Sequence, residues 1–118
     1  MLELHNVKAS TTSRIDVQLP QAASTRQRRE LTAFARYCIH RLERELGQRD
    51  AWIVEIAPFA GKYTTRIAVI DLFGAIEASG AGLDGALSIW EAMCHLEQSL
   101  RESPTTRAAR VARGASCV

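Results

Sequence analysis

Residues 52–79 have the sequence WIVEIAPFAGKYTTRIAVIDLFGAIEAS, in which short apolar segments alternate with turn residues. Ala60-Gly61-Lys62 and Phe73-Gly74 supply the turn signals. Pro58 has no N–H group to donate to a sheet, so we expect it to end the first segment. Valine, isoleucine and alternating polarity mark the segments between the turns as three antiparallel strands, over residues 52–57, 64–70 and 75–79.

An amphipathic helix is predicted before these strands, over residues 24–47. Ser24 or Thr25 can cap its first turn, and Gly47 can adopt the backbone conformation that ends a helix. Apolar residues recur at three- and four-residue steps and form one face: Leu31, Phe34, Ala35, Cys38, Ile39, Leu42 and Leu46. The opposite, solvent-facing side is basic, with Arg29, Arg36, His40 and Arg44.

A second helix is predicted after the strands, from Asp84 as its cap to about Glu102. Gly80-Ala81-Gly82 breaks the chain before it, and Ser103-Pro104 stops it. Its apolar stripe consists of Ala86, Ile89, Met93, Leu96 and Leu100.

Upstream of the first helix, residues 14–19 alternate apolar with polar side chains and predict a strand with one buried face. The predicted order is therefore β-α-β-β-β-α, an α+β fold in which one four-stranded sheet carries two helices on one face. Residues 14–102 form this domain. Residues 1–13 form an N-terminal arm or an extra edge strand, and residues 103–118 form a disordered basic tail.

Length and composition limit the class of protein. The 118 residues suffice for one domain, and 47% hydrophobic content is ordinary for a globular chain. No apolar run approaches the roughly 20 residues of a membrane span, and the first residues lack the pattern of a signal peptide. We therefore expect a cytoplasmic protein without a membrane partner.

Neither a metal site nor an enzyme is indicated. The three cysteines form no CxxC pair. On the two helices, the spacings of Cys38 with His40 and of Cys94 with His95 turn the side chains in different directions. The chain contains no glycine-rich phosphate loop, HExxH or GxSxG motif. We expect no catalytic residue, no metal and no cofactor.

Charge is distributed unevenly along the chain, although the net charge is only +2. Residues 24–50 contain seven arginines against four acidic residues, whereas residues 51–102 contain three basic residues against seven acidic ones. Phosphate recognition is one interpretation of the basic residues, and a solvated helix surface with pairs such as Arg41 with Glu45 is the other. The candidate RNA-binding residues are Arg26, Arg28, Arg29, Arg36, His40, Arg41, Arg44, Lys62 and Arg66.

The two tryptophans have different predicted roles. Both Trp52 and Trp90 could stack on bases, but packing in the core or in an interface is the better interpretation. Trp90 lies off the main stripe of the second helix and is the candidate interface residue, for instance in a homodimer.

The end of the predicted domain resembles the hibernation-promoting factor and ribosome-associated inhibitor family of bacteria. That family carries a small-residue strand, a glycine, an aspartate cap and apolar residues at fixed steps. The matching residues here are Ala78, Gly82, Asp84, Ile89, Met93, Leu96 and Leu100. The first helix is similar through Leu31, Phe34, Ile39, Leu42, Glu43 and Leu46, with Arg41 at a position that is often basic. The resemblance covers roughly residues 14–102.

The resemblance implies a non-enzymatic factor that binds the small ribosomal subunit and its ribosomal RNA near the decoding channel and excludes messenger and transfer RNA. The second helix departs from the family, because His95, Gln98 and Glu102 stand where basic residues are usual. Two alternatives remain. One is a protein-interaction or dimerisation module of the same fold without RNA binding. The other is a double-stranded RNA-binding domain, although residues 82–86 lack its basic cluster.

Overall fold

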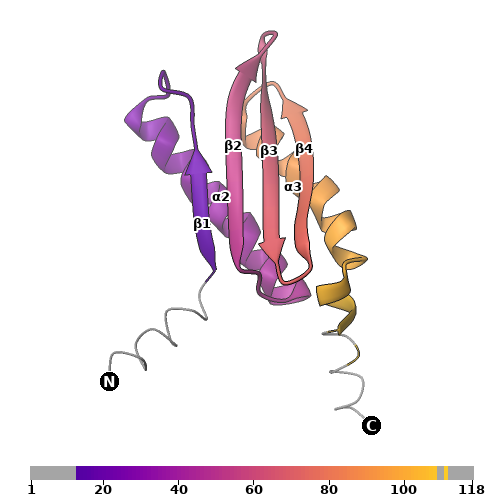
Figure 1. Cartoon of the computed structure of the whole chain (residues 1–118). Helices are drawn as coiled ribbons and strands as arrows, with labels where there is room; N and C mark the ends of the chain where they lie inside the picture. The colour runs from indigo at the N-terminus through magenta and orange to yellow at the C-terminus, as the bar shows by residue number, and fades with distance from the viewer. Residues whose placement is uncertain (1–12, 109–110, 112–118) are drawn as a thin grey trace, which may run out of the picture.

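A four-stranded sheet with two long helices on one face forms the protein, and the computed structural model describes residues 13–108 and Val111 (Figure 1). The elements in chain order are β1 (Arg14–Gln18), α2 (Thr25–Leu46), β2 (Ala51–Phe59), β3 (Lys62–Asp71), β4 (Gly74–Gly82) and α3 (Gly85–Arg101). The strands lie in the order β1-β2-β3-β4, with β1 parallel to β2 and the other pairs antiparallel. The predicted fold class is confirmed.

Helix α2 begins and ends where the sequence predicts. The side chain of Ser24 accepts a hydrogen bond from the N–H of Gln27 at 3.1 Å, and the Gln27 side chain accepts one from the N–H of Ser24 at 2.9 Å. Each bond satisfies a backbone donor that the helix leaves unpaired. At the other end, Gly47 has a φ of 98°, and its N–H donates to the carbonyl of Glu43.

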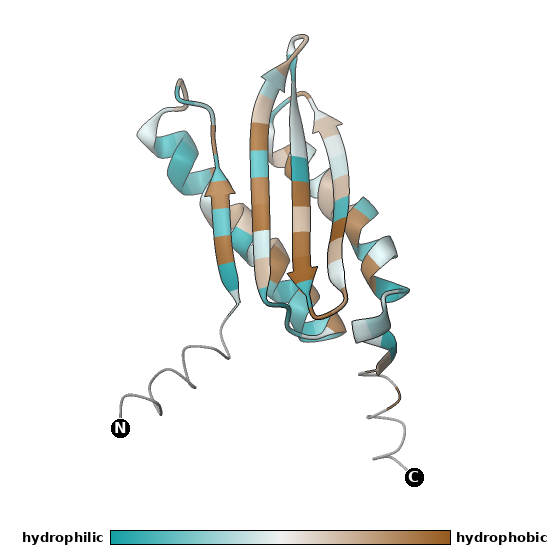
Figure 2. Ribbon diagram, viewed as in Figure 1, coloured by the Kyte–Doolittle hydropathy of each residue, from teal (hydrophilic) through white to brown (hydrophobic). Residues whose placement is uncertain are grey.

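The core lies between the sheet and the two helices. Trp52, Val54, Ile67 and Val69 supply its sheet side, and the apolar stripes of α2 and α3 cover them. Figure 2 shows mostly apolar residues along β2 and along the second half of β3. Each fully buried side chain of this size contributes roughly 1.5–3 kcal/mol to folding.

Helix α3 faces the sheet with smaller residues than predicted. Ala86 was expected in its apolar stripe, but it is exposed, and Gly85 and Ser88 are buried instead. The hydroxyl of Ser88 lies 2.6 Å from the hydroxyl of Thr65 and donates to the carbonyl of Gly85 at 2.8 Å. Ser88 thus packs on β3, whereas Gly85 lies against Leu31 of α2.

The prediction that Gly80-Ala81-Gly82 breaks the chain is wrong, because these residues complete β4. A Cβ atom on Gly80 would lie 2.3 Å from the backbone nitrogen of Ala92, and one on Gly82 would lie 2.7 Å from that of Ser88. Both glycines are therefore needed for the close approach of α3 to the edge strand.

The prediction that Pro58 ends its strand is also wrong, because β2 continues to Phe59. Strand β1 pairs with β2 only as far as Glu55. Pro58 consequently has no neighbour on that side, and its missing N–H costs no bond to β1. Ala60 and Gly61, with φ of 50° and 76°, then form the tight turn to β3.

Part of the predicted disordered tail is packed. Residues 104–108 are helical, and Ser103 and Thr106 are buried. The predicted arm over residues 1–13 lies outside the described residues except for Ser13, as do residues 109–110 and 112–118 of the tail.

Buried Arg49 holds the tail segment in place. Its guanidinium donates to the carbonyls of Leu46 and Gly47, both at 2.8 Å, and to the hydroxyls of Ser103 and Thr106 at 3.2 and 2.7 Å. The carboxylate of Asp71 lies 3.5 Å away. Burial lowers the pKa of Arg49, and the nearby carboxylates oppose this effect. The arginine thus connects the end of α2, the β3–β4 turn and the segment after α3.

Candidate nucleic-acid interface

Four of the predicted RNA-binding residues form one line on the solvent side of α2, which we call the basic stripe: Arg29, Arg36, His40 and Arg44. Seven- and four-residue steps bring side chains to the same side of a helix. All four are exposed, as predicted. No carboxylate pairs with the three arginines within the described part of the chain. Their charge is therefore available to an external anion.

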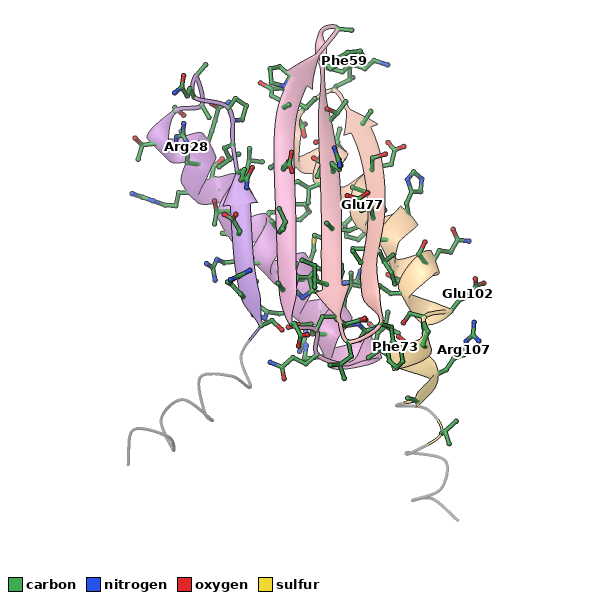
Figure 3. All side chains as sticks on the ribbon, in the orientation of Figure 1. Arg28, Phe59, Phe73, Glu77, Glu102 and Arg107 are labelled. Atoms are coloured by element: carbon green, nitrogen blue, oxygen red, sulfur yellow. The ribbon has the colours of Figure 1, made fainter. Side chains whose placement is uncertain are left out.

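Two further candidates at the start of α2 already have partners. Arg26 pairs with Glu30 at 2.9 Å on the exposed surface. Arg28, labelled in Figure 3, donates to the carbonyls of Pro20 and Gln21 at 2.8 and 3.1 Å. Arg28 therefore fastens the β1–α2 connection, which leaves less of its hydrogen-bonding capacity for RNA.

Arg41 lies in the seam between the two helices. It contacts Glu45, the predicted partner, at 3.6 Å and Glu97 of α3 at 3.3 Å. Arg101 contacts the same two carboxylates at 3.4 and 2.6 Å, which closes a ring of four ion pairs. The guanidinium of Arg41 also lies 5.9 Å from the centre of the Trp90 ring. This seam network of two arginines and two glutamates is electrically neutral.

The two candidates on the β2–β3 hairpin are separated from the basic stripe. Lys62 lies at the hairpin tip, next to Phe59 (Figure 3). Arg66 points to the sheet face opposite the helices, since its neighbours Thr65 and Ile67 are buried, and it pairs there with Glu77 at 3.2 Å. The fold thus brings four of the nine candidates together in an exposed, unpaired line.

Two polar side chains of α3 contact backbone groups of the edge strand β4. Ring nitrogen Nδ1 of His95 lies 2.7 Å from the carbonyl of Ser79, and Glu91 accepts a hydrogen bond from the N–H of Ala81 at 3.3 Å. These contacts cover backbone groups that an edge strand otherwise exposes to another chain. Of the three α3 positions at which the resemblance implies basic residues, His95 therefore has a structural role here.

A group of large apolar residues is exposed on the helical side, and we call it the helical-face patch. Its members, with their exposed fractions, are Tyr37 (59%), Leu83 (75%), Leu87 (52%) and Trp90 (46%). Sequence analysis identified only Trp90. Tyr37 and Leu87 could also have been identified from the sequence, because they are apolar residues that lie off the apolar stripes of their helices.

Metal-binding groups and cavities are two further kinds of feature that could form a site in the described residues. They contain no group of three histidine, cysteine or acidic residues that could hold a metal. A cavity of about 230 Å³ between the start of α2 and the β2–β3 hairpin is lined mainly by apolar residues, including Leu31, Ile56 and Tyr63. Burial raises the pKa of Cys38, which keeps its thiol protonated. None of the helices described has the length and apolarity of a membrane span.

The seam network should make stability depend on acid pH through Glu97. The hydrogen bond from Arg101, with further contributions from Arg41, lowers the pKa of Glu97. The stabilisation is complete above the unfolded-state pKa of about 4.3 and is lost as pH falls through the lower folded-state pKa. We expect Glu97→Gln to reduce the free energy of unfolding at pH 7 by up to about 1 kcal/mol.

Urea denaturation of wild type and Glu97→Gln at pH 7, 5 and 3 checks this expectation. The difference between the two proteins should shrink between pH 5 and 3. Glu55→Gln, on the open face of the sheet, is the control and should show no such convergence. A pH-independent difference for Glu97→Gln would contradict the assignment.

The β-α-β-β-β-α order, with both helices on one face of a four-stranded sheet, defines the class of small α+β domains that the sequence resemblance predicts. Two solved structures share this fold. The N-terminal domain of Protein Y from Thermus thermophilus superimposes with a TM-score of 0.63 at 18% identity, covering 76% of this chain and 97% of that one. A ribosomal subunit interface protein from Coxiella burnetii has a TM-score of 0.62 at 16% identity, covering 75% and 94%.

At these identities the comparison establishes a shared fold, which confirms the resemblance at that level. No protein-family model matches the chain, and no curated protein matches its sequence.

Proposed function

We propose that this protein binds the small ribosomal subunit through its basic stripe and inhibits translation by occupying space that messenger and transfer RNA need. The observation that carries the proposal is the line of unpaired arginines on α2. One solved structure of the same fold is described as a ribosomal subunit interface protein, which supports a ribosomal partner. Such a factor would act in the cytoplasm and would need no cofactor.

Phosphate chemistry explains why the basic stripe suits RNA. From Arg29 to Arg44 the helix rises about 22 Å, so the stripe can follow several phosphates of one RNA strand. Arginine forms two parallel hydrogen bonds to a phosphate, and release of condensed counterions supplies much of the affinity. The helix already fixes the backbone of these residues, so binding has to order only their side chains.

The proposed contact is one-sided. Glu91 and Glu102 are exposed on α3, and the seam network neutralises Arg41 and Arg101. Negative and neutral surface is unfavourable for a second run of phosphates. We therefore place RNA along α2, with Lys62 at the hairpin tip as a second contact and α3 turned away from the RNA.

Cosedimentation with purified small ribosomal subunits over a salt series tests the proposal. About three phosphate contacts predict a slope of roughly −2 to −3 in a plot of log K against log salt concentration. Affinity should therefore fall by about 20- to 50-fold between 50 and 200 mM salt. Absence of binding at the lowest salt would refute the proposal and would favour a protein-interaction module of the same fold.

A further inference from the structure

The helical-face patch takes its exposed apolar residues from both helices. Tyr37 lies on α2, Leu87 and Trp90 lie on α3, and Leu83 immediately precedes that helix. Contiguous exposed apolar surface on a soluble domain marks an interaction site more often than a free surface. Tryptophan and tyrosine are also the side chains that most often anchor protein interfaces.

The ion pairs of the seam network lower the free-energy cost of burying this surface in an interface. Arg41 and Arg101 are each paired with both Glu45 and Glu97, so the charges beside Trp90 are already compensated within the chain. Burying an unpaired charge in an interface is costly, whereas a closed network avoids that penalty. Arg41 over the Trp90 ring also restricts the indole before any partner arrives.

Charges on the two sides of the patch have opposite signs. The basic stripe lies on α2, and Asp84, Glu91 and Glu102 are exposed on α3. A twofold axis that runs along the helices, between the two copies, would place α2 of one copy against α3 of the other, and the reverse. Positive charge would then face negative charge twice, around an apolar centre. The same acidic rim is unfavourable for RNA.

We propose that the helical side of this protein is a self-complementary interface for a second copy of the same chain. The dimer is formed by the helical-face patch at its centre and by α2-to-α3 charge pairs on both flanks. Such a dimer would cover the arginines of the basic stripe. On the basis of the function proposed above, self-association and subunit binding would therefore compete for the same surface.

Sedimentation equilibrium of the full chain, without RNA and over a range of micromolar concentrations, measures the dimer directly. Removal of an anchoring tryptophan from an interface typically costs about 2 kcal/mol or more, which is about 30-fold in Kd. Both copies of the dimer carry the substitution, so Trp90→Ala should raise the dimer Kd by roughly 1,000-fold. Phe73→Ala is the matched control, because Phe73 is 62% exposed at the β3–β4 turn (Figure 3). It should leave the Kd unchanged. A wild-type monomer at all concentrations, or an unchanged Kd in Trp90→Ala, overturns the proposal.

A charge exchange tests the pairing of α2 with α3. Arg29→Glu/Arg36→Glu makes both helical flanks acidic, and Glu91→Lys/Glu102→Lys makes both basic. Each variant alone should dissociate, since like charges then face each other. An equimolar mixture should associate again as a heterodimer in which every flank is complementary. Failure of the mixture to associate, when each variant is folded by circular dichroism, overturns this arrangement.

The competition with RNA is tested separately with purified small subunits. Binding should require the monomer, so apparent affinity should fall when the total protein concentration exceeds the dimer Kd. Trp90→Ala should bind the subunits without this concentration dependence. If the dimer forms but no variant binds subunits, the proposed function fails while the dimer stands. If dimeric wild type binds as tightly as the monomer, the competition is refuted.

Discussion

Replacing Arg29 and Arg36 together by glutamate is expected to weaken binding to small ribosomal subunits by about 100-fold or more at low salt. Both arginines lie in the basic stripe, and neither has an acidic partner in the described residues. A hydrogen bond to a charged group contributes about 1.5–3 kcal/mol, and two such losses amount to at least two orders of magnitude in Kd. Glutamate adds repulsion from the phosphates. The slope of the salt dependence should also become shallower by about 2.

The matched control for this variant is Arg14→Glu/Arg66→Glu. It changes the net charge by the same amount, but both residues lie on the open face of the sheet, away from α2. Cosedimentation of this control should differ from wild type by only a few-fold, through the general reduction in positive charge. An equal loss of binding in the two variants would show that net charge, and not the basic stripe, determines affinity.

Replacing Arg49 by methionine is expected to lower the free energy of unfolding by about 3–5 kcal/mol, the range found when one partner of a buried ion pair is removed. The side chain of Arg49 is fully buried beside Asp71, which is nearly so. Methionine would leave the Asp71 carboxylate without its opposite charge, with hydrogen bonds only from Phe73 and Thr105 among the described residues. It would also leave the carbonyls of Leu46 and Gly47 without the guanidinium that donates to them. The midpoint of thermal unfolding should fall by more than about 10 °C.

Two control variants distinguish the effect of losing the buried hydrogen-bond network from the effect of losing one positive charge. Arg107→Met removes an exposed arginine from the same segment and should change stability by less than about 0.5 kcal/mol. Arg49→Lys keeps the charge, but one ammonium group cannot reach the acceptors that the guanidinium spans, so most of the loss should remain. Hydrogen exchange should also show faster exchange at Thr106 and Arg107. Stability of Arg49→Met within 1 kcal/mol of wild type would contradict this role.

The fold was largely predictable because its signals are local. Ser24 and Asp84 cap their helices, with donors at Gln27 and Leu87, and Gly47 ends α2. Apolar spacing identified most of the buried face of α2. The exposed line of Arg29, Arg36, His40 and Arg44 followed from the same periodicity, since residues opposite a buried stripe face solvent.

The wrong predictions concern residue types, such as glycine and proline, that are compatible with two different local structures. Glycine can end a strand, or it can let another element approach the strand closely. The short distances to the backbone of α3 show that Gly80 and Gly82 have the second role. Proline ends a strand that is paired on both sides but is tolerated where one side is free. Pro58 pairs with Tyr63 of β3, and β1 does not extend to it on the other side. The tail contains few apolar residues, and its packing depends on polar contacts with Arg49, distant in sequence.

The sequence by itself determined the order of elements, the two amphipathic helices and the basic side of α2, because capping, turn chemistry and periodicity act between residues near in the chain. Only the tertiary structure decided which charges remain available. It paired Arg41 and Arg101 with two glutamates in the seam and turned Arg66 to the opposite face. It also left Tyr37, Leu83, Leu87 and Trp90 exposed on or next to the two helices. These outcomes depend on how α2 and α3 pack on the sheet, and contacts between residues far apart in the chain leave no periodic pattern in a single sequence.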